Sequence, residues 1–368
     1  MNAWLFQDHR QKEKLGDKCS WSVGWIDPDG KRKSKKIGSH SLAEKFQRKT
    51  EGQLAAGTYE NQSKKKWAEF RAEYEKRGMP GVTAGTRNLT TYTFNHFERI
   101  VKPVRVSSLT GKSIAEYVAT RTAETARKGG PTVSPATVNR ELRNLRTIAR
   151  RANKWGYLPR LPEFEFLREP GKLAIYVSPE HFAKLYQHAD SARWPDEGPF
   201  APADWWRALL VTAYMTGWRI GSLLALRRED VDLETGFALS RAADNKGKRD
   251  QRVPLHPLAV DHLRKLASFS PLVFPWNHDR RGLFTEFHVI QRAADVRPEG
   301  AKRWYGFHDL RRAFATMNAP TLTADALQSL MQHKSYQTTQ RYISMARQLN
   351  PAVQNLYVPD LKATGTVG

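Results

Sequence analysis

Four side chains near the C-terminal end of the sequence have the types and spacing needed for chemistry on a phosphodiester. His308 and Arg311 are three residues apart in HDLRRAFAT, so a helix would place both on one face. His333 follows a run of helical periodicity that Thr323 can cap, and Tyr342 comes nine residues later in the polar segment TTQRYI. A polar helix with one tyrosine is a poor core element, although a single histidine or tyrosine taken alone is more often structural than catalytic.

A further arginine, Arg219, lies in the segment TGWRIGSLLAL. It comes directly after the apolar segment 202–215, which predicts a helix. An arginine between a glycine turn and the start of an apolar helix is costly to bury without an anion. A salt bridge to Glu229 or Asp230 is the alternative to a bound phosphate.

A basic hairpin follows this arginine. The sequence predicts a short strand at 237–240 and a second strand that ends at Leu255. The loop between them carries Lys246, Lys248 and Arg249, which are cations able to contact phosphates.

The motifs at 308–311 (HDLR), 330–333 (LMQH) and 338–342 (TTQRY) resemble, in order and spacing, the catalytic half of the tyrosine recombinase, or phage integrase, family. The segment around Arg219 resembles the first arginine box of that family. Ser222 is a departure, because the family usually has a glutamate three residues after the arginine. Another group must therefore orient Arg219 here, or its position is less restrained.

The resemblance implies a role for each member of a catalytic set. Relatives carry a catalytic lysine on the hairpin, and counting back from Val-Pro-Leu selects Lys246, with Lys248 as the alternative. The arginines would bind the phosphate, the tyrosine would form a 3'-phosphotyrosyl link, and the lysine would protonate the departing 5' oxygen. One histidine would accept the tyrosine proton and the second would hydrogen-bond to the phosphate. The implied catalytic residues are Arg219, Lys246, His308, Arg311, His333 and Tyr342.

We expect no metal and no other cofactor. The two histidines near Asp309 lack the i, i+4 spacing of a zinc-binding helix, and no acidic cluster suited to magnesium lies near them in the sequence. A covalent phosphotyrosyl link would conserve the ester, so no ATP is required either.

The composition favours a polyanionic partner. The sequence has 60 Lys and Arg against 37 Asp and Glu, a formal net charge of +23. No apolar run approaches the ~20 residues that span a bilayer, and the N-terminus lacks a secretory signal. The lone Cys19 cannot form an intrachain disulfide. We expect a cytoplasmic, nucleoid-associated protein of bacterial, phage or mobile-element origin, without a membrane partner.

The predicted fold class is a multidomain, mainly α-helical chain with small β-sheets. A β-hairpin or sheet plus a helix would form residues 1–60, similar to arm-type DNA-binding domains of some integrases. A helical bundle would form residues 61–158, similar to the family's core-binding (SAM-like) domain, and a mixed α+β tyrosine recombinase catalytic domain would form residues 177–348. Three prolines mark 159–176 as a linker, and residues 349–368 would be a tail that packs on its own domain or on a neighbour.

Two basic surfaces are candidate DNA contacts outside the catalytic domain. In the N-terminal part, Trp21, Val23 and Trp25 alternate before a turn at 27–30, and Ser41 can cap the helix that follows. The basic second strand fits a DNA groove, although a solvated edge that prevents aggregation is the alternative. For the helical bundle the alternative to DNA contact is an ordinary solvated surface, because charged outer faces are normal on any helix. The candidate contacts are Lys31, Arg32, Lys33, Lys35, Lys36, Lys64, Lys65, Lys66, Arg140 and Arg143, together with Lys248 and Arg249 of the catalytic hairpin.

The function that the resemblance implies is site-specific DNA recombination, as in the integrase of a phage or mobile element. It implies double-stranded DNA with paired attachment sites, a tetramer on that DNA, and an accessory directionality or DNA-bending protein as partners. Two alternatives remain open at this point. One is relaxation of supercoils by a type IB topoisomerase mechanism, and the other is a DNA-binding regulator with a vestigial catalytic set, for which Ser222 leaves room.

Overall fold

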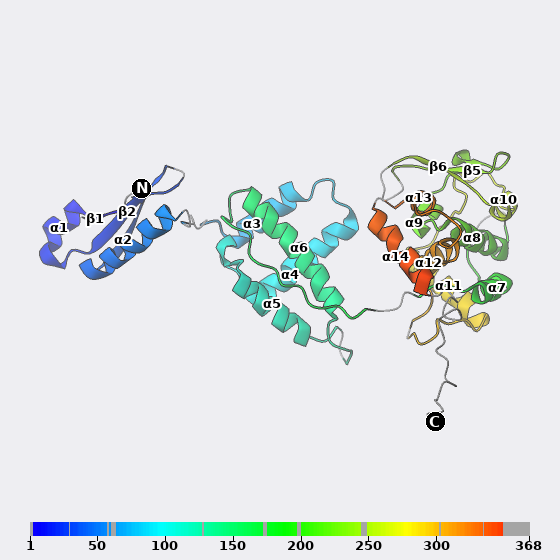
Figure 1. The fold of residues 1–368 in the computed structure, drawn as a ribbon, viewed down its shortest axis with the longest axis horizontal. Coiled ribbons are helices and arrows are strands. Elements are labelled where there is room, and N and C mark those ends of the chain that lie inside the picture. The colour runs from blue at the N-terminus through cyan, green and yellow to red at the C-terminus, as the bar shows by residue number, and fades with distance from the viewer. Residues whose placement is uncertain are drawn as a thin grey trace, which may run out of the picture. The chain divides into compact units, whose positions relative to one another are not determined.

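The structure, a computed structural model, describes most of the chain. The described residues are 3–28, 30–56, 59, 64–126, 129–171, 175–196, 200–243, 249–301, 303–333 and 335–348. The chain divides into two compact units, Met1–Gly171 and Lys172–Gly368. Figure 1 shows that helices predominate and that strands form two small sheets, one near the N-terminus and one in the second unit. This composition confirms the predicted fold class.

The N-terminal part is a three-stranded antiparallel sheet in the order β1-β2-β3 with a helix packed against it. The predicted hairpin is confirmed, because β2 and β3 pair across the turn at 27–30. Strand β1 was not predicted, and the helix cap was wrong: Ser39 is at the N-cap, and Ser41 lies inside the helix. The elements are β1 (Ala3–Gln7), α1 (His9–Leu15), β2 (Trp21–Ile26), β3 (Arg32–Gly38) and α2 (His40–Ala55).

A helical bundle follows in the same unit. Its core contains a chain of aromatic contacts around Phe70 and Phe94, both fully buried. The side-chain oxygen of Ser134 accepts a hydrogen bond from the Thr137 amide, as the predicted cap requires, and the apolar face of the helix after it is buried. The helices are α3 (Trp67–Glu73), a π-helical turn (Tyr74–Gly78), α4 (Ala84–Val101), α5 (Gly111–Ala123) and α6 (Pro135–Lys154).

The first part of the predicted linker is attached to this bundle. The Asn139 side chain donates to the Leu167 carbonyl at 2.8 Å and accepts from the Leu167 amide at 2.9 Å. Phe164 and Leu167 also pack against the core of the bundle. Although residues 161–171 form no helix or strand, their hydrogen bonds and apolar contacts fix them to helix α6.

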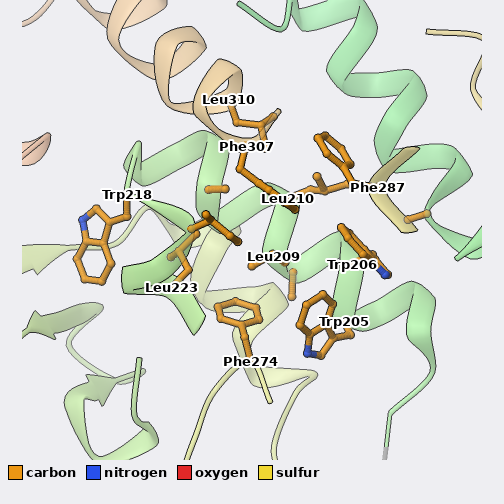
Figure 2. Packing of buried hydrophobic residues seen from close by; sticks show 14 of the residues in the cluster. Trp205, Trp206, Leu209, Leu210, Trp218, Leu223, Phe274, Phe287, Phe307 and Leu310 are labelled. Atoms are coloured by element: carbon orange, nitrogen blue, oxygen red, sulfur yellow. The ribbon is translucent and has the colours of Figure 1, made fainter. Parts of the chain in front are cut away.

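The second unit is built around one apolar helix, α8 (Pro202–Thr216). Trp205, Trp206, Leu209 and Leu210 of this helix are all fully buried. Figure 2 shows these side chains packed together with Phe287 of α11 (Arg280–Ala293) and with Phe307 and Leu310 of α12 (Phe307–Asn318). Helix α12 therefore packs against α8, which brings the HDLR motif close to the end of the helix that leads to Arg219.

Helices α7, α9 and α10 of the second unit also contact α8. A three-stranded antiparallel sheet has the order β4-β5-β6. Among the described residues, none of the helices combines the length and the apolar character needed to cross a membrane. The elements are α7 (Pro179–Gln187), α8 (Pro202–Thr216), α9 (Ile220–Leu224), β4 (Val231–Asp232), β5 (Phe237–Ser240), β6 (Gln251–Pro254), α10 (Pro257–Arg264), α11 (Arg280–Ala293), α12 (Phe307–Asn318), α13 (Ala324–Leu330) and α14 (Tyr336–Gln348).

Candidate active site

A glycine turn positions Arg219. Helix α8 ends at Thr216, and Gly217 has a φ of +63°, a left-handed conformation that glycine adopts at low cost. A Cβ atom at Gly217 would lie 2.6 Å from Cδ1 of Phe314, so no larger residue fits without movement. The chain then turns into α9, with Arg219 at its N-cap position.

Arg219 has no carboxylate partner among the described residues. The Nη1 atom of Arg219 is buried and has no hydrogen-bond partner in the part of the chain that the structure describes. Burial also lowers the pKa of the Arg219 guanidinium. The alternative salt bridge is not formed, because Arg241 binds both carboxylates, Asp230 at 2.7 and 2.8 Å and Glu229 at 2.7 Å. A partly buried guanidinium with an unpaired donor indicates a place for an external anion.

Arg311 is almost completely buried, with 1% of its surface exposed. Its Nη1 donates to the Gly217 carbonyl at 2.6 Å and its Nη2 to the Met331 carbonyl at 2.5 Å. Burial lowers the pKa of Arg311 to about 10, and the charge of Arg219 acts in the same direction. Arg311 thus connects α12 with the turn before Arg219 and with the end of α13.

His308 lies in the first turn of α12, as the motif spacing predicted. The residue is exposed. Partial loss of water around the ring lowers the pKa of His308, and the charges of Arg312 and Arg311 lower it further. The ring is therefore neutral at pH 7 and can accept a proton or a hydrogen bond.

Asp309 fixes the beginning of this helix. Its carboxylate accepts from the Gly306 amide at 2.8 Å and binds Arg303 at 2.6 and 2.9 Å and Arg312 at 2.9 Å. Only 2% of Asp309 is exposed. Sequence reasoning considered Asp309 as a possible metal neighbour and missed this role, which depends on residues brought together by folding.

His333 and Tyr342 lie against each other. Their rings are nearly parallel, with centroids 5.6 Å apart and an interplanar angle of 8°. His333 is buried, and its Nδ1 lies 3.0 Å from the hydroxyl of Thr339. This contact with α14 fixes the position of the ring. The pKa of His333 is lowered to about 4, mainly by burial, and the charges of Arg311 and Arg219 act in the same direction. Tyr342 in turn raises the pKa of both Arg219 and Arg311, so its hydroxyl is close enough to interact with them.

A cleft of about 450 Å³, here called the arginine cleft, opens between α9, α11 and the start of α12. Its polar lining consists of Ser222 and the cationic or imidazole side chains of Arg219, Arg280, His308 and Arg311, and no acidic residue lines it. Sequence reasoning missed Arg280, because arginines at the start of an amphipathic helix carry no signal of their own. The cleft can therefore bind an anion.

Ser222, in place of the usual glutamate, is buried beside Asp230 and Arg241. These residues and Trp218 line a small cavity of about 10 Å³, and Trp218 and Ser222 also line the arginine cleft. The carboxylate that lines this cavity with Ser222 is that of Asp230, and Arg241 binds it.

The remaining predicted residues have mixed outcomes. Lys246, Lys248 and the tail 349–368 lie outside the described residues, and Arg249 is exposed. Among the described residues, no group of three or more His, Cys, Asp or Glu side chains is arranged to hold a metal.

On the N-terminal sheet, Lys31, Arg32, Lys35 and Lys36 are exposed, and Lys33 is partly buried with its Nζ 3.8 Å from Asp27. In the bundle, Lys64, Lys66 and Arg140 are exposed, whereas Lys65 pairs with Glu73 at 3.1 Å and Arg143 with Glu169 at 3.3 Å.

Comparison with known proteins identifies proteins similar to parts of this chain. Residues 177–348 match the family described as the phage integrase family. The tyrosine recombinase XerA of Pyrococcus furiosus is 30% identical over 158 residues, which cover 40% of this chain and 53% of XerA. The tyrosine recombinase XerC of Chlorobaculum parvum is 26% identical over 235 residues, which cover 57% of this chain and 69% of XerC. The first of these alignments thus spans about half of the relative.

Solved structures share the fold over more of the chain. A lambda integrase tetramer bound to a Holliday junction has a TM-score of 0.58 at 16% identity, covering 92% of this chain and 94% of that one. The Tn1549 transposon integrase in complex with a circular intermediate DNA has a TM-score of 0.57 at 15% identity, covering 78% of this chain and 98% of that one. Residues 177–348, the part of the chain that carries the site, thus match the phage integrase family, and the chain shares the fold of these integrase structures.

Proposed function

We propose that this protein is a site-specific DNA recombinase that cuts and rejoins DNA through a covalent link to Tyr342. The observation that carries the proposal is the convergence of Arg219, Arg311 and His308 on a cleft without acidic residues, with His333 and Tyr342 interacting with the same arginines. Such a site favours an anion that a phenolic oxygen can reach.

The chemistry follows from these groups. Arg219 and Arg311 bind the nonbridging oxygens of one phosphate and stabilise the extra negative charge of the transition state. The Tyr342 oxygen attacks phosphorus and forms the 3'-phosphotyrosyl bond, while the bond to the 5' oxygen breaks. Neutral His308 accepts the phenolic proton, and His333 donates a hydrogen bond to the phosphate.

The leaving 5' oxygen needs a proton. We assign this step to Lys246 on the hairpin between β5 and β6, with Lys248 as the alternative, on the resemblance to the family alone. A 5'-hydroxyl from a second DNA strand then attacks the phosphotyrosyl bond, so the ester passes to the new strand and Tyr342 is released. This reversal is the step that would make the reaction a strand exchange.

The rest of the chain would hold DNA around this site. Residues 1–60 are proposed as an arm-type DNA-binding domain and residues 61–158 as a core-binding domain, joined by the segment 159–176 to the catalytic domain 177–348. Paired attachment sites and a tetramer on DNA are proposed by analogy with the lambda integrase tetramer, which is bound to a Holliday junction. An accessory directionality or DNA-bending protein belongs to the same proposal.

A covalent capture experiment tests the proposed nucleophile. Duplexes selected for binding from a random library would be nicked near the cleavage point, so that the released fragment diffuses away and the adduct persists. Wild-type protein is expected to form a denaturant-resistant adduct, and Tyr342→Phe should bind the same DNA and form none. Tyr336→Phe is the matched control, because Tyr336 begins the same helix and is 47% exposed. An adduct with Tyr342→Phe would show that another residue is the nucleophile.

A second measurement separates recombination from its alternatives. Two marked duplexes that carry the selected site are incubated with the protein, and exchange of the marked strands is followed. Exchange supports a recombinase, relaxation of a supercoiled plasmid without exchange supports a topoisomerase, and binding without an adduct supports a regulator.

A further inference from the structure

Arg280 is a third arginine of the arginine cleft that the proposed chemistry does not use. It is the first residue of α11 and is exposed. Its Nη2 atom lies 4.0 Å from the point where a Cβ atom of Gly221 would stand. The side chain therefore extends from α11 toward the wall of the cleft formed by α9.

Arg280 lies in this cleft without a compensating charge. Among the described residues, no carboxylate is within 4.0 Å of its guanidinium, and no residue that lines the cleft is acidic. The neighbouring Asp279 does not compensate it, because its side chain caps α11 by accepting from the Gly282 amide at 2.6 Å. A guanidinium that remains exposed and unpaired beside two other arginines is suited to bind an anion from outside the chain.

Its position differs from that of the two arginines assigned to the reacting phosphate. Arg311 is buried and Arg219 is partly buried, whereas Arg280 is exposed on a different helix. Each strand of duplex DNA carries one phosphate per ~3.4 Å of helix axis, so a strand bound in the cleft presents a second phosphate next to the first. The mouth of the cleft can receive that neighbour while its interior binds the first.

We infer that Arg280 binds a second DNA phosphate, next to the one that is cut, and thereby positions the strand in the arginine cleft. This inference rests on the proposed function, since it assumes a DNA strand in the cleft. Arg280 is a positioning residue in this scheme, and the reacting atoms do not touch it. Its loss should weaken DNA binding without slowing cleavage of DNA that is already bound.

Arg280→Ala and Arg281→Ala form a matched pair for the test. Both arginines are exposed and adjacent on α11, but only Arg280 lines the cleft. Arg280→Ala should weaken binding of the selected duplex about tenfold and lower the salt dependence of binding by about one phosphate contact. Arg281→Ala should change the affinity and its salt dependence less than Arg280→Ala does. For both variants the rate of adduct formation at saturating DNA should stay within about twofold of wild type.

A neutral methylphosphonate placed at one phosphate at a time locates the contact. A methylphosphonate at one position next to the cleavage point should weaken DNA binding by wild type and by Arg281→Ala. The same substitution should not weaken DNA binding by Arg280→Ala any further. The inference is overturned if the two variants behave alike, if every methylphosphonate weakens Arg280→Ala further, or if Arg280→Ala slows adduct formation at saturating DNA. Failure of the proposed function is a separate result, since wild type would then form no adduct.

Discussion

The carbonyl oxygen of Gly217 accepts a hydrogen bond of 2.6 Å from Nη1 of Arg311, across 94 residues of sequence. The bond connects the turn that carries Arg219 to the helix that carries His308. Arg311 makes a second bond to the Met331 carbonyl, two residues before His333. One buried guanidinium thus fixes the three segments that carry Arg219, His308 and His333 relative to one another.

The substitution Gly217→Ala should disrupt this connection. Gly217 has a φ of +63°, and its new methyl group would lie 2.6 Å from a ring carbon of Phe314. Strain and overpacking together should lower the free energy of unfolding by about 2–4 kcal/mol. Adduct formation should fall as well, because the Gly217 carbonyl can no longer hold Arg311 in place. Urea denaturation and covalent capture measure the two effects.

Gly300→Ala is the control for the backbone contribution. Gly300 has nearly the same φ, +64°, but no atom lies within 4 Å of its added methyl group. This variant should lose only about 1 kcal/mol and should keep its activity. Equal losses of stability in the two variants would show that the contact with Phe314 is unimportant.

The fold could be predicted where local sequence signals agree with tertiary packing. Helix α6 has a Ser-Pro start and a regular apolar face, and β5 lies where the sequence placed it. Strand β1 was missed because its pairing with β2 is long-range and its five residues have no strong alternation. The cap of α2 was misplaced by two residues because Ser39 and Ser41 are both suitable cap residues.

The candidate site shows the same division. The HDLR and LMQH motifs could be identified from residue type and spacing, and the structure places their side chains near Arg219. The surrounding interactions could not be predicted. Arg241, which directly follows β5, binds Asp230 and Glu229, and Arg280 reaches the cleft from another helix. Such partners are set by tertiary contacts, which local patterns do not encode.

Asp309→Asn should destabilise the start of α12. The Asp309 carboxylate is 2% exposed and binds Arg303 and Arg312, so its neutralisation leaves two guanidinium groups without their buried partner. Breaking such a buried ion pair typically costs about 3 kcal/mol. The pKa of His308 should also decrease further, because the negative charge of Asp309 raises it. Urea denaturation and NMR titration of the His308 ring measure these two changes.

Asp261→Asn is the matched control for this prediction. Asp261 also pairs with an arginine, Arg264 at 3.3 Å, but the two side chains are 63% and 56% exposed. An exposed ion pair contributes less than about 1 kcal/mol, so this variant should be close to wild type in stability. If both aspartate variants lose the same amount, burial of the Asp309 network has no special effect.

His333 should make the protein less stable in acid. The pKa of His333 is lowered from 6.5 to about 4 in the folded protein. Between these values the unfolded chain binds a proton that the folded chain does not, so stability decreases as the pH falls from about 6.5 to about 4. A shift of this size corresponds to at most about 3 kcal/mol. Above pH 6.5 this contribution should be constant.

The measurement is the urea midpoint at a series of pH values for wild type, His333→Gln and His9→Gln. Glutamine does not titrate, so His333→Gln should lose less stability than wild type between pH 6.5 and pH 4. His9→Gln should follow the wild-type curve, because the His9 side chain is 88% exposed and far from the site in sequence. His308 contributes in the same direction, and its exposed ring makes that contribution smaller. A His333→Gln curve parallel to that of wild type would mean that His333 is protonated in the folded protein near pH 6, and that it cannot be the neutral hydrogen-bonding partner stacked on Tyr342.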